Sequence, residues 1–231
     1  MAKNNKIEFF SYVEGVADTH PIIPARELSF KWVKLLTEDY KRNINERNHI
    51  RKCPGIFDIL GTGYVVPLPW DVNIKLDDTG FGYELPGQYL PQMTGTEQLV
   101  GPHKNIPGID RLCLKFCTPW HVIAPCKFVV IPIPYPDMKG FESVHGILDP
   151  EKSTELNAQV WWNTNGIVNL KAGTPMMQII PLSDEKFSHT VRDATEKDKQ
   201  WVKRRLYLSQ HSFQHPFHLM AKAYNKFFSR G

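Results

Sequence analysis

The chain has 231 residues, of which 42% are hydrophobic and 23% are charged, and its net charge of +4 is too small to predict nucleic-acid binding by itself. No apolar run approaches the roughly 18 residues of a membrane-spanning helix, and no apolar segment of a secretory signal follows the polar N-terminus. These features argue against a membrane protein and a secreted one. They predict that the four cysteines are free thiols in a reducing, cytoplasmic interior.

The first third of the chain predicts a strand, a helix and two further extended segments. Residues 7–12 alternate between polar and apolar side chains, which is typical of a strand. Ser29 can cap a helix that runs to about Arg42 with apolar residues near one face. Residues 64–70 and 72–76 are extended, and the two prolines in the first of these segments favour an edge strand or a bulged one.

The middle of the chain predicts a long loop followed by a series of short strands. Residues 86–110 are rich in Gly and Pro, and we expect a surface loop of the kind that often carries function. The strands predicted after it cover residues 111–116, 128–133, 158–162, 167–170 and 176–180, with a proline-bracketed extended segment at 119–125. A further strand begins at about residue 144 and ends in a turn at residues 146–149 (GILD). We expect residues 128–133 to form the most deeply buried strand, because they are almost wholly apolar.

The apolar period becomes helical from Thr195 onward. One helix face is marked by Val202, Leu206 and Phe213, Pro216 ends that helix, and a second face is marked by Phe217, Met220, Tyr224 and Phe227. The sequence therefore predicts a single, mainly β domain over residues 1–231. Its core, at about residues 53–182, is expected to be a sandwich or a β-clip-like structure. One N-terminal helix and two C-terminal helices pack outside this core, and the two C-terminal helices form an extension at about residues 195–229.

The C-terminal extension carries most of the positive charge. Residues 195–231 contain eight Lys or Arg residues against two acidic ones, which leaves about +6 of formal charge. Lys203, Arg204 and Arg205 are consecutive, so on a helix they spread over roughly 200° and do not form one stripe. This pattern predicts nucleic-acid binding that is at most weak and independent of sequence, and the alternative is a solvated helix face.

No set of catalytic residues in the sequence is complete. Asp149 is the best candidate for a catalytic residue, since it lies in a Gly-containing turn where a carboxylate can act as a general base; the alternative is a turn residue that binds its own backbone. Tyr64 and Trp120, with His121 and His145, are candidate binding residues, because aromatic rings stack on bases and sugars. The alternative for these aromatic residues is a place in the core.

The spacing of histidines and cysteines predicts no metal site. No H-x-H or H-x-D pair places two ligands on one strand face, although four histidines could converge in space: His103, His121, His145 and His189. Cys113 and Cys117 lack the second pair that a zinc site needs. Gly61 and Gly63 are not followed by the Gly-Lys-Ser/Thr ending of a phosphate-binding loop. We therefore expect neither a metal nor another cofactor.

Five motifs spread over residues 7–190 carry a resemblance to a known family. They are Cys53-Pro54, the segment 63–68 (GYVVPL), the segment 119–125 (PWHVIAP), the segment 146–149 (GILD) and the segment 173–181 (GTPMMQIIP). The pattern resembles a functionally uncharacterised family found in tailed bacteriophages, including marine T4-like ones, and in some bacteria. The resemblance implies a phage-encoded accessory or assembly protein, in the host cytoplasm or the virion, with other phage proteins or further copies of itself as partners.

Residues 144–181 also resemble the β-clip hairpins of dUTPases and dCTP deaminases. In those enzymes a Gly-hydrophobic-Ile-Asp turn precedes a strand that ends in Asn, and a Gly-containing turn leads to an Ala-Gln-hydrophobic strand end. The corresponding positions here are 146–149, Asn163, Gly173 and Gln178, and the resemblance implies that Asp149 is the catalytic or sugar-facing carboxylate. The Arg-Ser phosphate-binding motif is absent, since Lys127-Phe128-Val129 stands in its region, and no Gly-rich tail follows.

Three classes of function stay open at this point. We favour a non-enzymatic accessory, assembly or binding protein encoded by a phage, because no catalytic or cofactor motif is complete. The first alternative is a nucleotide-processing enzyme related to dUTPases that uses Asp149. The second alternative is weak, non-specific nucleic-acid binding through the basic C-terminal helices.

Overall fold

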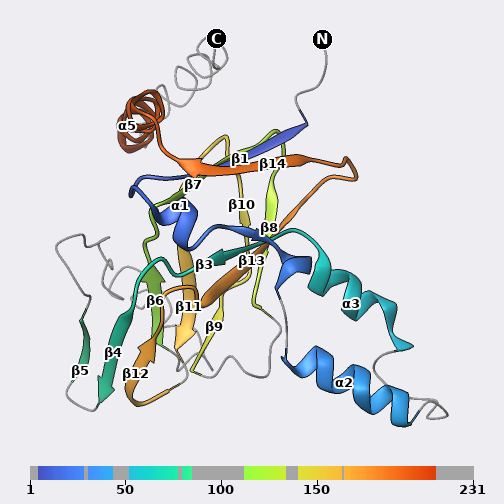
Figure 1. The fold of residues 1–231 in the computed structure, drawn as a ribbon. Helices are drawn as coiled ribbons and strands as arrows, with labels where there is room; N and C mark the ends of the chain where they lie inside the picture. The colour runs from blue at the N-terminus through green and yellow to red at the C-terminus, as the bar shows by residue number, and fades with distance from the viewer. Residues whose placement is uncertain are drawn as a thin grey trace, which may run out of the picture.

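The computed structural model of the chain is mainly β, with 42% of residues in strands and 22% in helices, as the sequence predicts. It describes residues 5–28, 31–43, 52–77, 80–84, 112–133, 140–162 and 164–211. The predicted loop at 86–110 and the second C-terminal helix lie outside these residues, as does His103. Figure 1 shows several small sheets gathered into one body with helices at its margins.

The largest sheet has five strands, and every neighbouring pair in it is antiparallel. Its order is β10 (Gly146–Leu148), β8 (Phe128–Ile131), β13 (Pro175–Pro181), β3 (Tyr64–Pro67) and β2 (Ile23–Pro24). The proline-containing strand β3 is therefore interior, not an edge. It is nevertheless irregular, because the register with β13 shifts beside Pro67, between Pro175 and Met177.

Three smaller sheets surround the five-stranded sheet, each with three strands. The first has the order β14 (Ser188–Asp193), β1 (Lys6–Ser11) and β7 (Trp120–Ile123). The second has the order β6 (Leu112–Phe116), β11 (Ala158–Trp162) and β9 (Phe141–Ser143). The third has the order β12 (Gly166–Leu170), β4 (Val72–Asp77) and β5 (Gly80–Glu84). The pair β1–β14 is parallel and joins segments about 180 residues apart in the chain. Strand β14 was not predicted.

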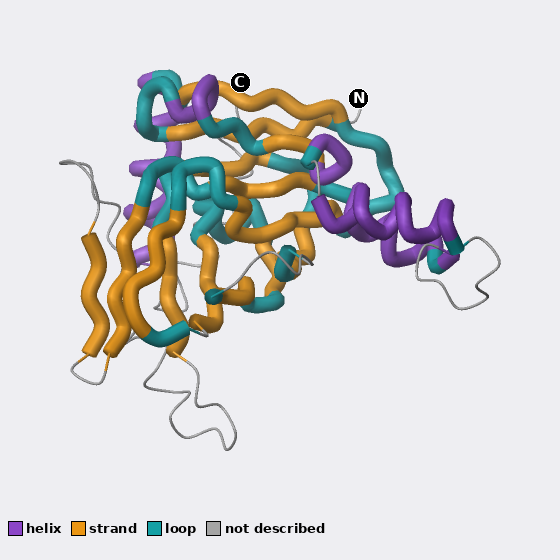
Figure 2. The backbone as a smooth tube through the Cα atoms, turned by 60° about the horizontal axis from the view of Figure 1, so that its bottom comes forward, coloured by secondary structure: helices purple, strands orange, loops and turns teal. Residues whose placement is uncertain are grey.

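The described helices are α1 (Val16–Thr19), the short 3₁₀ helix η1 (Ala25–Glu27), α2 (Lys31–Arg42), α3 (Pro54–Gly61) and α5 (Glu196–His211). Helices α2 and α5 confirm the N-terminal and the first C-terminal helix. Helix α3 was not predicted, although proline at its first position is a favourable start. Figures 1 and 2 place the α2–α3 pair and the β12–β4–β5 sheet on opposite sides of the molecule.

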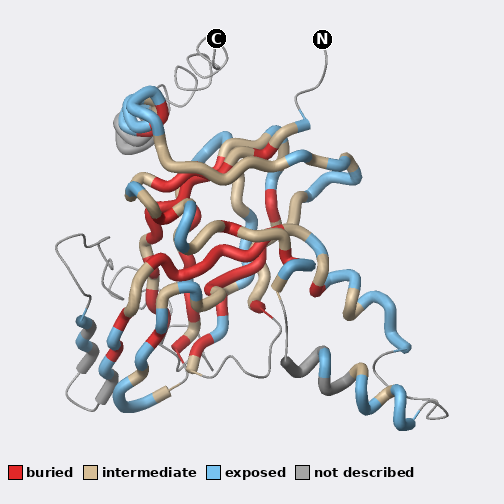
Figure 3. The backbone as a smooth tube through the Cα atoms, in the orientation of Figure 1, coloured by how far each residue is buried: buried red, intermediate tan, exposed pale blue. Residues whose placement is uncertain are grey.

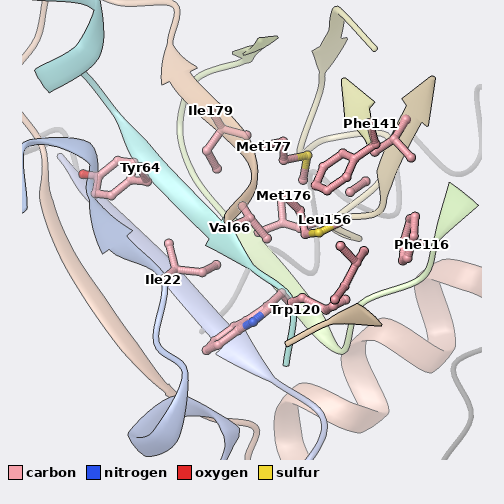
Figure 4. Packing of buried hydrophobic residues seen from close by; sticks show 14 of the residues in the cluster. Ile22, Tyr64, Val66, Phe116, Trp120, Phe141, Leu156, Met176, Met177 and Ile179 are labelled. Carbon is pink, nitrogen blue, oxygen red and sulfur yellow. The ribbon is translucent and has the colours of Figure 1, made fainter. Parts of the chain in front are cut away.

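The main core lies between the inner face of the five-stranded sheet and the sheets around it (Figure 3). Trp120, Phe9 and Phe128 are completely buried there, and Figure 4 shows Trp120 with Met176 and Met177 in the same cluster. The expectation that residues 128–133 form the most buried strand is wrong. Phe128 is buried but residues 129–132 are half-buried, because β8 has core packed on one face only.

One glycine permits the close approach of β3 and β13. Gly63 has a φ of +78°, which side chains rarely adopt, and a Cβ placed on it would lie 2.1 Å from the carbonyl oxygen of Ile179. No other residue fits this position without movement of the backbone. Gly63 therefore determines how the chain enters the middle of the five-stranded sheet.

Candidate functional site

Asp149 lies in the turn that follows β10, and its contacts are those of a turn residue. One carboxylate oxygen accepts a hydrogen bond from the backbone N–H of Glu151 at 3.1 Å, and the other lies 3.2 Å from Nζ of Lys127. Its backbone carbonyl accepts hydrogen bonds from the N–H groups of Lys152 and Ser153. One contact of the carboxylate and both contacts of the backbone carbonyl therefore hold the turn together.

Tyr64 and Trp120 are both core residues. Trp120 is completely buried, and its indole N–H has no hydrogen-bond partner among the described residues. The ring of Tyr64 packs edge-on against Phe9 at 4.9 Å and against His189 at 5.1 Å. Neither aromatic ring presents a face on which a base or sugar can stack.

His121 follows Trp120 in β7, so it is buried on the opposite face of the β14–β1–β7 sheet. Its ring lies 5.3 Å from that of Phe10 and 4.4 Å from that of Tyr12, and its Nδ1 lies 3.0 Å from Oγ1 of Thr154. Burial lowers the pKa of His121 to about 4, so the ring is neutral near pH 7. Loss of water around the ring, not a nearby cation, causes this shift.

The candidate residues do not converge on one site. His121 pairs with Phe10 and His189 pairs with Ile7, so the two imidazoles lie on opposite faces of the same sheet. His145 is exposed just before β10 and lies four residues from Asp149, about 13 Å along an extended chain. The structure thus does not bring these histidines together at the Asp149 turn.

Asp198 docks the start of α5, and the basic residues Lys203 and Arg204 follow further along the same helix. Asp198 is buried and accepts hydrogen bonds from Arg192 at 2.6 Å and from the backbone N–H of Thr195 at 2.9 Å. Although burial opposes its ionisation, these hydrogen bonds hold the pKa of Asp198 well below its usual range. Lys203 and Arg204 are exposed, while the side chain of Arg205 lies outside the described residues.

Apolar side chains gather on the outer face of the five-stranded sheet. Ile147 lies opposite Val129 in the β10–β8 pair, and Val129 lies next to Ile180 across the β8–β13 pair. Because residues opposite each other share a face, these side chains form one row across three strands. We call this surface the aliphatic face, and it consists of Val129, Ile131, Ile147, Ile180 and Leu182.

Among the residues that the structure describes, the aliphatic face is the less covered half of a surface whose other half is packed. Toward β2, the small cluster of Ala25, Val65 and Ile133 is buried. Gln178 is also buried there, and its Nε2 donates to the carbonyl oxygens at the end of α3. Toward β10 the cover ends, and Ile147 is 61% exposed. At the end of β13, Leu182 is 50% exposed.

Sequence reasoning missed the aliphatic face. Strands β8 and β13 are apolar at nearly every position, so the pattern cannot distinguish the covered face from the open one. One signal was available in β10. Leu148 packs against the core, so its neighbour Ile147 must point to the opposite face of the sheet.

In the described part of the chain, no three His, Cys, Asp or Glu side chains lie close enough together to hold a metal ion. None of the helices in those same residues is long and apolar enough to cross a membrane. No protein-family model, curated protein or solved structure matches the chain.

Proposed function

We propose that this protein is a non-enzymatic binding protein that associates with another protein chain through its aliphatic face. The observation that carries the proposal is the row of branched aliphatic side chains from Ile147 to Ile180, with Leu182 beside it. Ile147 and Leu182 are exposed and the others are half-buried. Grouped aliphatic side chains that remain partly in water are typical of protein interaction surfaces, since burial against a partner is favourable.

The residues that could support catalysis favour the same conclusion. Asp149 is bound to Lys127 and to its own turn, His121 is buried against aromatic rings, and His145 stands apart from both. Hydrolysis of a nucleoside triphosphate needs positive groups around the phosphates as well as a base beside the water. Among the described residues, Lys127 is the cation that pairs with Asp149, and this ion pair joins the turn to the segment before β8.

The finer details of the predicted identity are part of this proposal. We propose that the β body belongs to the sandwich or β-clip type, and that the protein is a phage-encoded accessory or assembly protein. It would act in the host cytoplasm or in the virion. These points rest on the sequence motifs around Gly63, Trp120 and Gly173.

The test is site-specific cross-linking in cells that produce the protein in its natural context. A photo-reactive amino acid at position 182 should cross-link to one defined protein chain, and Ile180→Lys should abolish that product. The matched control is the same group at position 167, since Ile167 is 72% exposed on a different sheet. Equal products from both positions, or none from position 182, would contradict the proposal.

A second candidate function is nucleic-acid binding through α5, because Lys203 and Arg204 are exposed on it. Such binding would depend on contacts with phosphates and would weaken steeply with salt. Lys203→Glu with Arg204→Glu should remove any binding that is measured at low salt. Binding that is tight, selective for sequence and resistant to physiological salt would place this function first.

A further inference from the structure

We propose that β10 is the pairing edge of a symmetric dimer, in which β10 of a second copy lies antiparallel to it and continues the five-stranded sheet. The inference rests on the proposed function, since it names a second copy of this chain as the protein that uses the β10 end of the aliphatic face. It commits to one register, with the two Ile147 residues directly opposite each other.

The outer edge of β10 is open in the described part of the chain. Strand β10 ends the five-stranded sheet, and β8 is the one described strand that pairs with it. His145, Gly146 and Ile147 are exposed. Natural sheets protect such edges with lysine, proline, a bulge or a very short strand. Strand β10 is short, at 3 residues, but no lysine, proline or bulge lies between Gly146 and Leu148, so its outer N–H and C=O groups can pair with another strand.

The residues around Ile147 complement themselves under a two-fold rotation. In an antiparallel pair centred on Ile147, His145 of each copy lies opposite the partner's Asp149, so an imidazole meets a carboxylate twice. Gly146 lies opposite the partner's Leu148, which leaves room for the larger side chain. An isologous interface requires such self-complementarity, because each patch must bind an identical patch.

The same register continues the rows of the sheet across the two-fold axis. Ile180, Val129 and Ile147 of one copy would be followed by the same three residues of the second copy in reverse order. Asp149 would lie between Lys127 of its own chain, 3.2 Å away, and the partner's His145. Apolar pairs and hydrogen-bonded polar pairs of this kind are the unit of stabilisation between neighbouring strands.

A second copy fits this edge better than an unrelated strand does. An unrelated strand would have to present an acid and a base at the same spacing around an apolar residue. This chain already presents His145, Ile147 and Asp149 in the required order. The imidazole donor and the carboxylate acceptor on either side of Ile147 therefore select a second copy as the occupant.

Disulfide cross-linking tests the register directly. Opposed Cα atoms in an antiparallel pair lie about 4.5 to 5.5 Å apart, within the range that a disulfide spans. Ile147→Cys, in a background in which the exposed Cys53 is serine, should form a covalent dimer on mild oxidation. Ile167→Cys, on the equally accessible strand β12, is the matched control and should form no covalent dimer.

A mixed experiment separates this register from others. His145→Cys protein and Asp149→Cys protein, mixed in equal amounts and oxidised, should form the heterodimer and little of either homodimer. Homodimers of the His145→Cys protein alone, or equal cross-linking of Ile147→Cys and Ile167→Cys, would overturn the assigned register.

Sedimentation analysis tests the dimer itself. The wild-type protein should dimerise with rising concentration, and Ile147→Lys should shift it to monomer. At concentrations at which the wild type is also monomeric, the two melting temperatures should agree. If Ile147→Lys does not fold, His145→Glu places a carboxylate opposite the partner's Asp149 from an exposed position and should weaken the dimer at least tenfold. A wild-type monomer at every concentration, or a dimer that both variants leave intact, would overturn the proposal. If position 182 still cross-links another protein in that case, the binding function stands and self-pairing alone fails.

Discussion

Single residues at the entrance of the five-stranded sheet tolerate little change. Gly63→Ala must adopt a φ of +78° and also moves the backbone of Ile179 or its own, because the new Cβ lies 2.1 Å from that carbonyl oxygen. We expect a loss of at least about 2 kcal/mol of unfolding free energy. The measurement is denaturant unfolding beside Gly166→Ala, whose φ is +92° but whose Cβ meets nothing within 4 Å. Equal losses would mean that the close approach has no energetic weight.

Asp149 should matter for stability and not for turnover. Asp149→Asn keeps an oxygen for the N–H of Glu151 but loses the ion pair with Lys127, so we expect a loss of about 1 kcal/mol. The measurements are thermal unfolding and incubation with dUTP and dCTP, with and without Mg²⁺. Asp184→Asn, in an exposed turn, is the matched control. Wild-type turnover that disappears in Asp149→Asn would favour the enzyme alternative.

The buried imidazole of His121 makes stability depend on pH. Its folded pKa is about 4 and its ordinary value is 6.5, so between these values the unfolded chain binds more protons than the folded chain. Stability is therefore fully present above about pH 6.5 and decreases as the pH falls toward 4. The decrease attributable to this residue is about 3 kcal/mol, since one pKa unit corresponds to about 1.4 kcal/mol.

The check for His121 is denaturant unfolding at several pH values. His121→Phe, placed between Phe10 and Tyr12, should flatten the pH dependence in this window. His145→Gln, at an exposed position, should leave it unchanged. If His121→Phe and the wild type lose stability in parallel, another group is responsible.

At the scale of elements, one carboxylate docks α5 onto the β14–β1–β7 sheet. Asp198 joins the helix start at Thr195 to Arg192 on β14, and Arg192 also lies 3.2 Å from Glu8 on β1. Asp198→Ala removes the capping bonds and leaves Arg192 with one carboxylate. We expect a loss of about 2 to 3 kcal/mol, because Asp198 itself is buried.

Glu196→Ala is the matched control for the docking of α5. Glu196 is in the same helical turn and pairs with Lys199, but its side chain is 78% exposed, so its loss should be within about 0.5 kcal/mol. Hydrogen exchange of the α5 amides should increase in Asp198→Ala and not in Glu196→Ala. Equal exchange in the two variants would show that Val202 and its neighbours hold the helix without this ion pair.

At the scale of the whole molecule, the four cysteines are free thiols in very different surroundings. Cys53 is exposed, whereas Cys113 is buried, and burial raises the pKa of the Cys113 thiol. We expect about four titratable thiols per chain under denaturing, non-reducing conditions. In the folded protein Cys53 should react first and Cys113 last. Fewer thiols after denaturation would reveal a disulfide and contradict a reducing location.

Local patterns in the sequence were sufficient to predict many individual elements. Alternation predicts β4 because Val72 and Ile74 pack on the core while Asn73 and Lys75 between and after them meet water. Apolar residues three or four apart, at Phe30, Val33, Leu36 and Tyr40, predict the helix that the structure has as α2. Turn residues around Asp149 mark the boundary between β10 and β11, and those around Gly173 mark the boundary between β12 and β13. These features depend on neighbours in the chain, and a single sequence contains that information.

The tertiary structure decided how those elements meet. Strand β14 has little apolar alternation and exists because it pairs in parallel with β1, about 180 residues earlier. Strands β8 and β13 are apolar on both faces, so only the position of η1 and α3 determines that Val65 and Gln178 are covered and Ile147 is not. The aliphatic face and the open edge of β10 are therefore products of long-range packing, because burial depends on what the rest of the chain places against a residue.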